Sequence, residues 1–185
     1  MISREQRLRW GVRTIVTCGL CILTGPAGAT SLGALTLASP GFPSGGEIPR
    51  QHTCDGADRS PALTWGTVPE GTKSFALIVD DPDAPAGTWV HWVVYDLPAN
   101  TTQLSQGLDP TDRLANGGTQ GLNDFQKPGY GGPCPPPGKA HRYFFRLYAL
   151  DAATNLQPRA TKAALIKAIE GHVLEQAELM GTYKR

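Results

Sequence analysis

The sequence predicts a mainly β protein, an antiparallel β-sandwich with a C-terminal helix and a long Gly/Pro-rich loop. Short runs of strand-forming residues alternate with turn signals, a pattern typical of a sandwich. The 185 residues include 22 glycines and 16 prolines without a period, which argues against long helices over most of the chain. Hydrophobic residues make up 40% of the chain, enough for one core, and the length predicts one domain.

Residues 1–29 have the layout of a secretory signal peptide. A basic start contains Arg4, Arg7, Arg9 and Arg13. An uncharged stretch over residues 14 to about 24 follows, and Ala27-Gly28-Ala29 is a small-residue cleavage pattern. We expect this leader to be removed and residues 30–185 to form an exported domain, periplasmic or secreted. The alternatives are a misassigned start and a retained membrane anchor, although the stretch is short for a span of about 20 residues.

The charge and cysteine counts narrow the class of protein further. The formal net charge is +1, and about −2 without the leader, so no excess charge points to nucleic acid or an anionic membrane surface. The mature chain keeps only Cys54 and Cys134. In an oxidising compartment two cysteines suggest one disulfide, and two separate thiols are the alternative, because the sequence does not show whether the loops approach.

Five runs are predicted to be strands, in the order residues 32–37, 62–65, 74–79, 89–95 and 142–150. The third is apolar throughout, which predicts burial on both faces. A helix is predicted from Thr161 to about residue 180, because Leu165, Ile166, Ile169, Val173, Ala177 and Met180 recur at steps of three or four. Thr161 would cap its start and Gly181 its end. Residues 100–139 form the long loop, whose glycines allow close ligand approach and whose prolines restrict its shape.

Polar residues concentrate at three places. Asp81 and Asp83 follow the buried strand, where aspartates also commonly cap a turn. In the next strand, alternation places Trp89 and His91 on one face and Val90 and Trp92 on the other. In the last predicted strand, His141 and Tyr143 share a face, and Arg142 points away as an ion-pair partner.

These segments carry a family resemblance. Asp81-Pro82-Asp83-Ala84-Pro85, then Trp89-Val90-His91-Trp92, then Gly-Pro-Cys-Pro-Pro before His141-Arg142-Tyr143 resemble the phosphatidylethanolamine-binding protein family. The similarity is closer to its bacterial, Raf-kinase-inhibitor-like branch and runs from about Leu35 to Tyr183. The chain departs from the commoner bacterial pattern at Asp58-Arg59, where Asn is more usual, and at Gln126-Lys127-Pro128.

The resemblance implies a β-sandwich whose pocket binds phosphate or another small anion, including phospholipid head groups. Carried over by motif, the expected ligand-binding residues are Asp81, Asp83, Trp89, His91, Pro135, Pro136, His141 and Tyr143. It implies a binding or regulatory protein and no enzyme, with a small anionic partner, no cofactor and no nucleic acid, and leaves a protein partner open. Histidine and tyrosine would donate to the anion, and an aspartate would orient a histidine.

Two enzymatic alternatives use the same residues. Two His and two Asp are possible zinc ligands for a hydrolase, but no tight pair such as His-x-x-x-His is present. A nucleophilic hydrolase would need an activated Ser or Cys. No Gly-x-Ser-x-Gly elbow occurs, and Ser60, Ser74 and Ser105 have no activating context.

Overall fold

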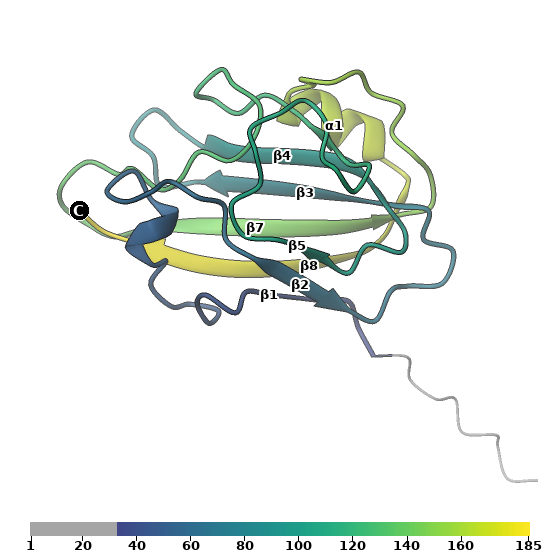
Figure 1. Cartoon of the computed structure of the whole chain (residues 1–185), viewed down its shortest axis with the longest axis horizontal. Coiled ribbons are helices and arrows are strands. Elements are labelled where there is room, and N and C mark those ends of the chain that lie inside the picture. The colour runs from purple at the N-terminus through teal and green to yellow at the C-terminus, as the bar shows by residue number, and fades with distance from the viewer. Residues whose placement is uncertain (1–32) are drawn as a thin grey trace, which may run out of the picture. The chain divides into compact units, whose positions relative to one another are not determined.

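The computed structural model describes residues 33–185, so the predicted signal peptide lies outside the described residues. Within them the chain forms two antiparallel sheets, a short 3-10 helix (Arg50–His52) and one α-helix, which confirms the mainly β, sandwich-like class (Figure 1). The elements are β1 (Thr36–Ala38), β2 (Leu63–Gly66), β3 (Ser74–Asp81), β4 (Trp89–Pro98), β5 (Gln103–Leu104), β6 (Thr119–Gln120), β7 (His141–Leu150), α1 (Lys162–Ile169) and β8 (Val173–Tyr183).

The larger sheet has the strand order β6-β4-β3-β7-β8, and the smaller sheet has the order β1-β2-β5. β3 lies at the centre, and all eight of its residues are buried. One hydrophobic cluster covers its first face, where Trp65 of β2 packs edge-on against Phe75 with ring centroids 5.6 Å apart. A second cluster covers the opposite face and includes Ile78 with Leu165 and Ile169 of α1. Burial on both faces explains why this strand is apolar throughout.

The predicted C-terminal helix is correct only in its first half. α1 begins after Thr161, whose hydroxyl accepts a hydrogen bond from the backbone N–H of Ala164 at 3.3 Å. It ends at Ile169, and Gly171 has a φ of 79°, a left-handed conformation that ends helices. The residues that follow form β8, which pairs with β7 along almost its whole length.

The apolar spacing was misleading because residues at steps of three or four were taken to share one buried face. In the structure Ala177 is buried, but Val173 is exposed, and an extra residue at Leu174 puts Val173 out of phase with Ala177. In β8 burial alternates, so that Ala177, Leu179, Gly181 and Tyr183 are buried. Gly181, predicted to end the helix, lies within the strand at a point where a Cβ would come within 2.6 Å of Ile48.

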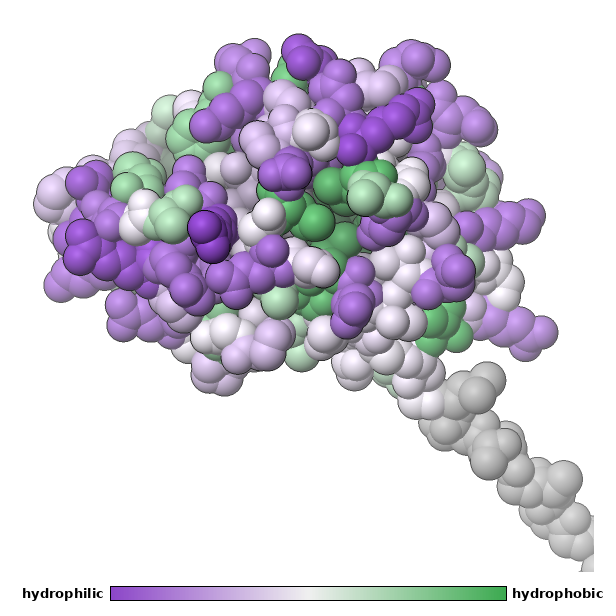
Figure 2. Space-filling view, in the orientation of Figure 1, coloured by the Kyte–Doolittle hydropathy of each residue, from purple (hydrophilic) through white to green (hydrophobic). Residues whose placement is uncertain are grey.

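The five predicted strands overlap β1, β2, β3, β4 and β7. The stretch over residues 100–139 contains the two-residue strands β5 and β6 and is otherwise irregular, as expected of a long loop. The face seen in Figure 1 is mainly hydrophilic, with hydrophobic side chains gathered in a hollow near its centre (Figure 2). In the part of the chain that the structure describes, α1 is too short and insufficiently apolar to cross a membrane.

Candidate functional site

A cavity of about 270 Å³ lies at one end of the larger sheet. β3 ends there, and β4 and β7 begin there because both run antiparallel to β3. The cavity is lined by Asp81, Ala84, Pro85, Ala86, Trp89, His91, Phe125, Cys134, Pro135, Pro136, His141 and Tyr143. The three polar segments of the sequence therefore meet in one hollow.

Asp83 is the one expected site residue that the structure does not bring to the lining. Its two carboxylate oxygens accept hydrogen bonds from the guanidinium of Arg142 at 2.7 and 2.8 Å, and one also accepts from the Arg142 backbone N–H at 3.0 Å. This fork of hydrogen bonds lowers the pKa of Asp83 to about 2. Asp83 thus ties the turn after β3 to the start of β7, and Arg142 is the structural ion-pair partner that the sequence suggested.

His91 reaches the cavity through a β-bulge. Val90 and Trp92 pair with consecutive residues of β3, so His91 is the extra residue of β4. The bulge breaks the alternation, since Val90 joins the cluster beside α1 while Trp92 joins the main core. The prediction that Val90 and Trp92 share a face is therefore wrong, whereas Trp89 and His91 do line the same cavity.

The ring of His91 is held by the loop that follows β6. Its Nδ1 lies 2.6 Å from the carbonyl oxygen of Gly131, whose N–H donates back to the His91 carbonyl at 2.9 Å. A carbonyl oxygen only accepts, so Nδ1 carries the proton and Nε2 is left for a ligand. Burial lowers the pKa of His91 below its ordinary value of 6.5, although the Gly131 carbonyl opposes the shift. The imidazole is consequently neutral near pH 7.

His141 is oriented in the same way by a carboxylate. Its Nδ1 lies 2.8 Å from Oδ2 of Asp81, and both residues are buried. The other oxygen of Asp81 accepts the backbone N–H of Asp83 at 2.8 Å. An aspartate was expected to orient a histidine, and Asp81 occupies that position. Because its Nδ1 is engaged, His141 also offers Nε2 to a ligand.

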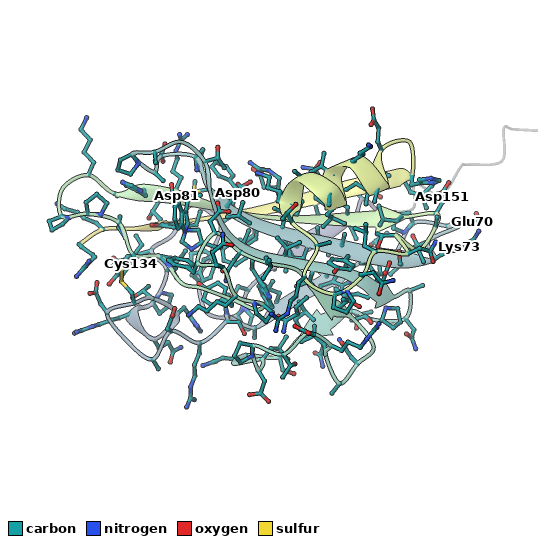
Figure 3. All side chains as sticks on the ribbon, turned by 90° about the horizontal axis from the view of Figure 1, so that it is seen from above. Glu70, Lys73, Asp80, Asp81, Cys134 and Asp151 are labelled. Carbon is teal, nitrogen blue, oxygen red and sulfur yellow. A yellow bond between two sulfur atoms is a disulfide. The ribbon has the colours of Figure 1, made fainter. Side chains whose placement is uncertain are left out.

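The neighbouring carboxylate belongs to a different environment. Asp80 faces the opposite side of the sheet, where it accepts from Arg146 at 2.7 Å and pairs with Lys162 of α1. Figure 3 shows Asp80 and Asp81 side by side at the end of the molecule where Cys134 lies. Strand alternation thus directs Asp80 to a structural ion pair and Asp81 to the cavity.

Aromatic rings form much of the remaining wall. Phe125 stands edge-on to Trp89 and to His91, with centroids 5.4 and 5.6 Å apart, and His91 stands edge-on to Tyr143 at 5.2 Å. Among the described residues, the indole N–H of Trp89 and the hydroxyl of Tyr143 are buried without a hydrogen-bond partner. Burial, reinforced by the carboxylate of Asp81, raises the pKa of Tyr143 well above its usual range, so its hydroxyl remains a donor.

Phe125 is an aromatic lining residue that the expected ligand-binding set did not include. It follows Asn123 and Asp124 in a loop without periodicity, so no local pattern marked it. Asp124 exchanges two hydrogen bonds with the backbone of Val90, at 2.7 and 2.9 Å, and thereby docks the loop on β4. Gly131 leaves room for the ring, since a Cβ there would lie 2.6 Å from Phe125.

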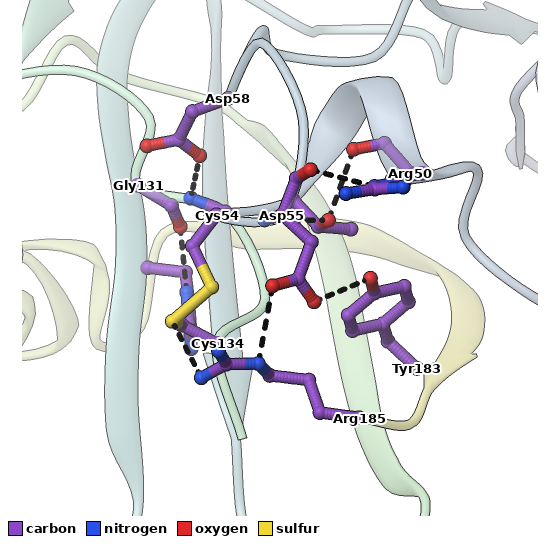
Figure 4. The surroundings of a disulfide bond; sticks show 11 residues. Arg50, Cys54, Asp55, Asp58, Gly131, Cys134, Tyr183 and Arg185 are labelled. Carbon is purple, nitrogen blue, oxygen red and sulfur yellow. Dashed lines mark hydrogen bonds and ion pairs between the residues drawn. A yellow bond between two sulfur atoms is a disulfide. The ribbon is translucent and has the colours of Figure 1, made fainter. Parts of the chain in front are cut away.

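The proline-rich wall is attached by a disulfide. Cys54 and Cys134 are bonded, with their Cα atoms 5.4 Å apart, and the Cys54 N–H donates to the carbonyl of Pro133 at 3.1 Å (Figure 4). The bond joins the loop after the 3-10 helix to the segment that brings Pro135 and Pro136 into the lining. Of the two alternatives that the sequence left open, the structure has the bonded pair.

The lining has neither a hydroxyl nucleophile of the serine type nor a free thiol. It contains no serine or threonine, and its one cysteine is bonded to another. Across residues 33–185, no group of three His, Cys, Asp or Glu side chains is arranged to hold a metal ion. The cavity instead combines two oriented imidazoles, two buried donors without partners and an apolar wall.

Curated relatives resemble the chain over most of their length. The UPF0098 protein of Methanothermobacter thermautotrophicus is 49% identical over 151 residues, which cover 82% of this chain and 99% of the relative. The UPF0098 protein of Aquifex aeolicus is 50% identical over 149 residues, which cover 80% of this chain and 86% of the relative.

Two solved structures share the fold. The phosphatidylethanolamine-binding protein homologue CT736 of Chlamydia trachomatis is 40% identical, with a TM-score of 0.76, and the match covers 82% of this chain and 98% of that one. YbcL of E. coli, described as a member of the mammalian PEBP family, is 34% identical, with a TM-score of 0.77, and the match covers 83% and 99%. The family pattern itself matches residues 38–184. The chain therefore belongs to the phosphatidylethanolamine-binding protein family.

Proposed function

We propose that this protein is a binding or regulatory protein that holds a small anion, such as phosphate or a phospholipid head group, in the cavity at the end of β3. Membership in the family supports a binding role at that coarse level. The observation that carries the finer proposal is the pairing of both imidazoles through Nδ1, to Gly131 and to Asp81. Because Nδ1 of each ring is engaged, Nε2 of His91 and of His141 is the ring nitrogen available to a ligand.

The proton on each Nε2 decides what the cavity attracts. A neutral imidazole that donates through Nδ1 presents a lone pair at Nε2, which does not favour an anion. Protonation turns Nε2 into a charged donor and offsets the repulsion from Asp81. Because burial holds the pKa of His91 below 6.5, anion binding is expected to strengthen as the pH falls from 8 to 5.

The test is the affinity for sulfate, phosphate and phosphoethanolamine, measured by calorimetry from pH 5 to pH 8. Sulfate does not titrate in this range, so its pH dependence reports the protein alone. One linked proton makes the affinity for sulfate rise up to about tenfold per pH unit of acidification. An affinity that stays flat, or rises with pH, contradicts the proposal.

A matched pair of variants separates the cavity from general charge effects. His141→Ala removes a charge-assisted hydrogen bond and is expected to weaken binding about 10- to 100-fold. His172 is the control, because it also pairs through Nδ1 with a carboxylate, Asp151, at 2.8 Å but is exposed and does not line the cavity. His172→Ala is expected to bind like the wild type, and an equal loss in both variants would argue against the cavity as the site.

We also propose that the protein is exported, either to a periplasm or out of the cell, and acts there on a soluble anion or a phosphorylated partner. The leader pattern over residues 1–29 supports export, and so does a disulfide, because such bonds persist in oxidising compartments. The mass of the protein recovered from a secreting host tests this. A chain that begins at Thr30 is expected, and an intact Met1 in the exported fraction contradicts cleavage after Ala29.

A further inference from the structure

We propose that the Cys54–Cys134 disulfide is a site of directional thiol–disulfide exchange, in which a dithiol attacks Cys54 and releases Cys134, and that this exchange loosens the wall of the anion cavity. The proposed exchange concerns only the sulfur atoms and does not depend on the proposed function. The proposed loosening of the cavity wall rests on that function only where it is measured as a change in anion affinity.

The bond joins two exposed residues and borders the cavity. Cys54 and Cys134 are both exposed residues, and Cys134 belongs to the cavity lining. Exposed disulfides are more readily reduced than buried structural ones, since a thiolate must approach along the S–S axis. A disulfide between exposed residues at the edge of the cavity is the first requirement if thiol–disulfide exchange is to affect the cavity wall.

A cationic side chain contacts one of the two sulfurs (Figure 4). Nη1 of Arg185 lies 3.8 Å from Sγ of Cys134. The guanidinium is held there by Asp55, whose carboxylate lies 3.2 Å from Nε of Arg185 and also accepts from Tyr183 at 2.8 Å. Among the described residues, a guanidinium thus contacts the sulfur of Cys134, and no cationic side chain contacts that of Cys54. A thiolate that develops on Cys134 is therefore stabilised more than one on Cys54.

This asymmetry sets the order of bond changes. A thiolate of the dithiol attacks Sγ of Cys54, the Cys54–Cys134 bond breaks, and its electron pair leaves on Cys134 as a thiolate beside Arg185. The second thiol of the reductant then attacks the reductant sulfur that is bonded to Cys54 in the mixed disulfide, and Cys54 leaves as a thiolate. The dithiol is oxidised to a disulfide, and its two protons end on the two cysteines.

The wall has few other attachments. In the segment Pro133-Cys134-Pro135-Pro136-Pro137, four of the five residues lack an N–H, so the backbone offers a single donor. The Pro133 carbonyl accepts from Cys54, and the next backbone bond is that of the Gly138 N–H to the Arg185 carbonyl at 3.2 Å. Between these points the disulfide is the cross-link, so its loss frees the part of the wall that contains Pro135 and Pro136.

The direction of exchange is tested with glutathione, followed by trapping with N-ethylmaleimide and peptide mapping. The adduct is expected on Cys54, and an adduct mainly on Cys134 overturns the assignment. Arg185→Gln is expected to slow reduction by dithiothreitol about three- to fivefold, from the loss of one charge near 4 Å in a solvated setting. Arg185→Lys restores the rate, and the control Lys184→Gln, with the same net charge as Arg185→Gln, leaves it unchanged. Equal rates in Arg185→Gln and Lys184→Gln contradict the role of Arg185.

The effect on the cavity is tested with two independent readouts on oxidised and reduced protein. Phosphate affinity is expected to fall about tenfold on reduction and in the Cys54→Ser/Cys134→Ser variant. The indole N–H resonance of Trp89, assigned with Trp89→Phe, is expected to shift on reduction whether or not phosphate binds. If the oxidised protein does not bind phosphate, the proposed function fails while the resonance still decides the coupling. An indole resonance that does not shift on reduction overturns the proposed loosening of the cavity wall. A reduced protein without a cooperative unfolding transition also overturns it, because the change would then involve the whole fold.

Discussion

Replacing Asp81 separates the contribution of its hydrogen bonds from that of its charge. The buried carboxylate accepts from Nδ1 of His141 and from the backbone N–H of Asp83, both at 2.8 Å. Asp81→Ala removes both acceptors and leaves two donors without partners. Asp81→Asn keeps an oxygen for Asp83, and its amide N–H can donate to Nδ1 of His141, whose proton then moves to Nε2.

The structure sets the expected size of the two effects. A hydrogen bond to a charged group contributes about 1.5–3 kcal/mol to stability and a neutral one about 1 kcal/mol. Water entering the cavity can replace part of this in Asp81→Ala, so we expect its free energy of unfolding to fall by about 2–4 kcal/mol. Asp81→Asn preserves the number of hydrogen bonds, and its loss is expected to stay within about 1 kcal/mol.

Urea unfolding followed by tryptophan fluorescence at pH 7.5 measures both variants. The slope of unfolding free energy against urea must match the wild type for the comparison to hold. An alanine variant within about 0.5 kcal/mol of the wild type would refute the assignment of Asp81 as a buried acceptor. An asparagine variant as unstable as the alanine variant would show that the charge, and not the hydrogen bonding, stabilises this corner.

Three further predictions follow from single contacts. Gly132→Ala places a Cβ 2.3 Å from the backbone oxygen of His52, which cannot rotate away, so urea unfolding is expected to show a loss of about 3 kcal/mol, and a loss below about 1 kcal/mol would contradict this packing. Cys54→Ser with Cys134→Ser opens a link across 80 residues and is expected to lower the unfolding free energy by about 4 kcal/mol, while an unchanged value would show that the bond does not constrain the unfolded chain. Burial lowers the pKa of His91 below 6.5, so the unfolded chain binds more protons than the folded protein, and stability is lost as the pH falls below 6.5. His91→Gln is therefore expected to lose less unfolding free energy than the wild type between pH 7.5 and pH 5. An equal loss in both proteins would show that His91 is not the cause.

Some features of the site were visible in the sequence because they depend on neighbours along the chain. Alternation placed His141 and Tyr143 on one face, and both line the cavity. The same alternation failed for Val90 and Trp92, because a bulge at His91 inserts one residue against β3. A bulge is a property of a strand pair, so one strand read alone does not reveal it.

Other features depended on contacts between residues that are far apart in the sequence, which no local pattern predicts. Asp83 follows Asp81 by two residues, and only the position of Arg142 separates their roles. The disulfide depended in the same way on whether two loops, 80 residues apart in sequence, lie close in space. Phe125 became part of the wall because its loop docks on β4, a contact without periodicity in the sequence.

Local sequence was enough to predict the mainly β class, the places of β3, β4 and β7, the cap at Thr161 and the family motifs, since strand propensity, turn chemistry and capping act over a few residues. Tertiary structure alone decided that residues 173–183 form β8 and not a helix. Their apolar residues recur at helical steps, but the edge of β7 needed hydrogen-bond partners along its length and selected the strand.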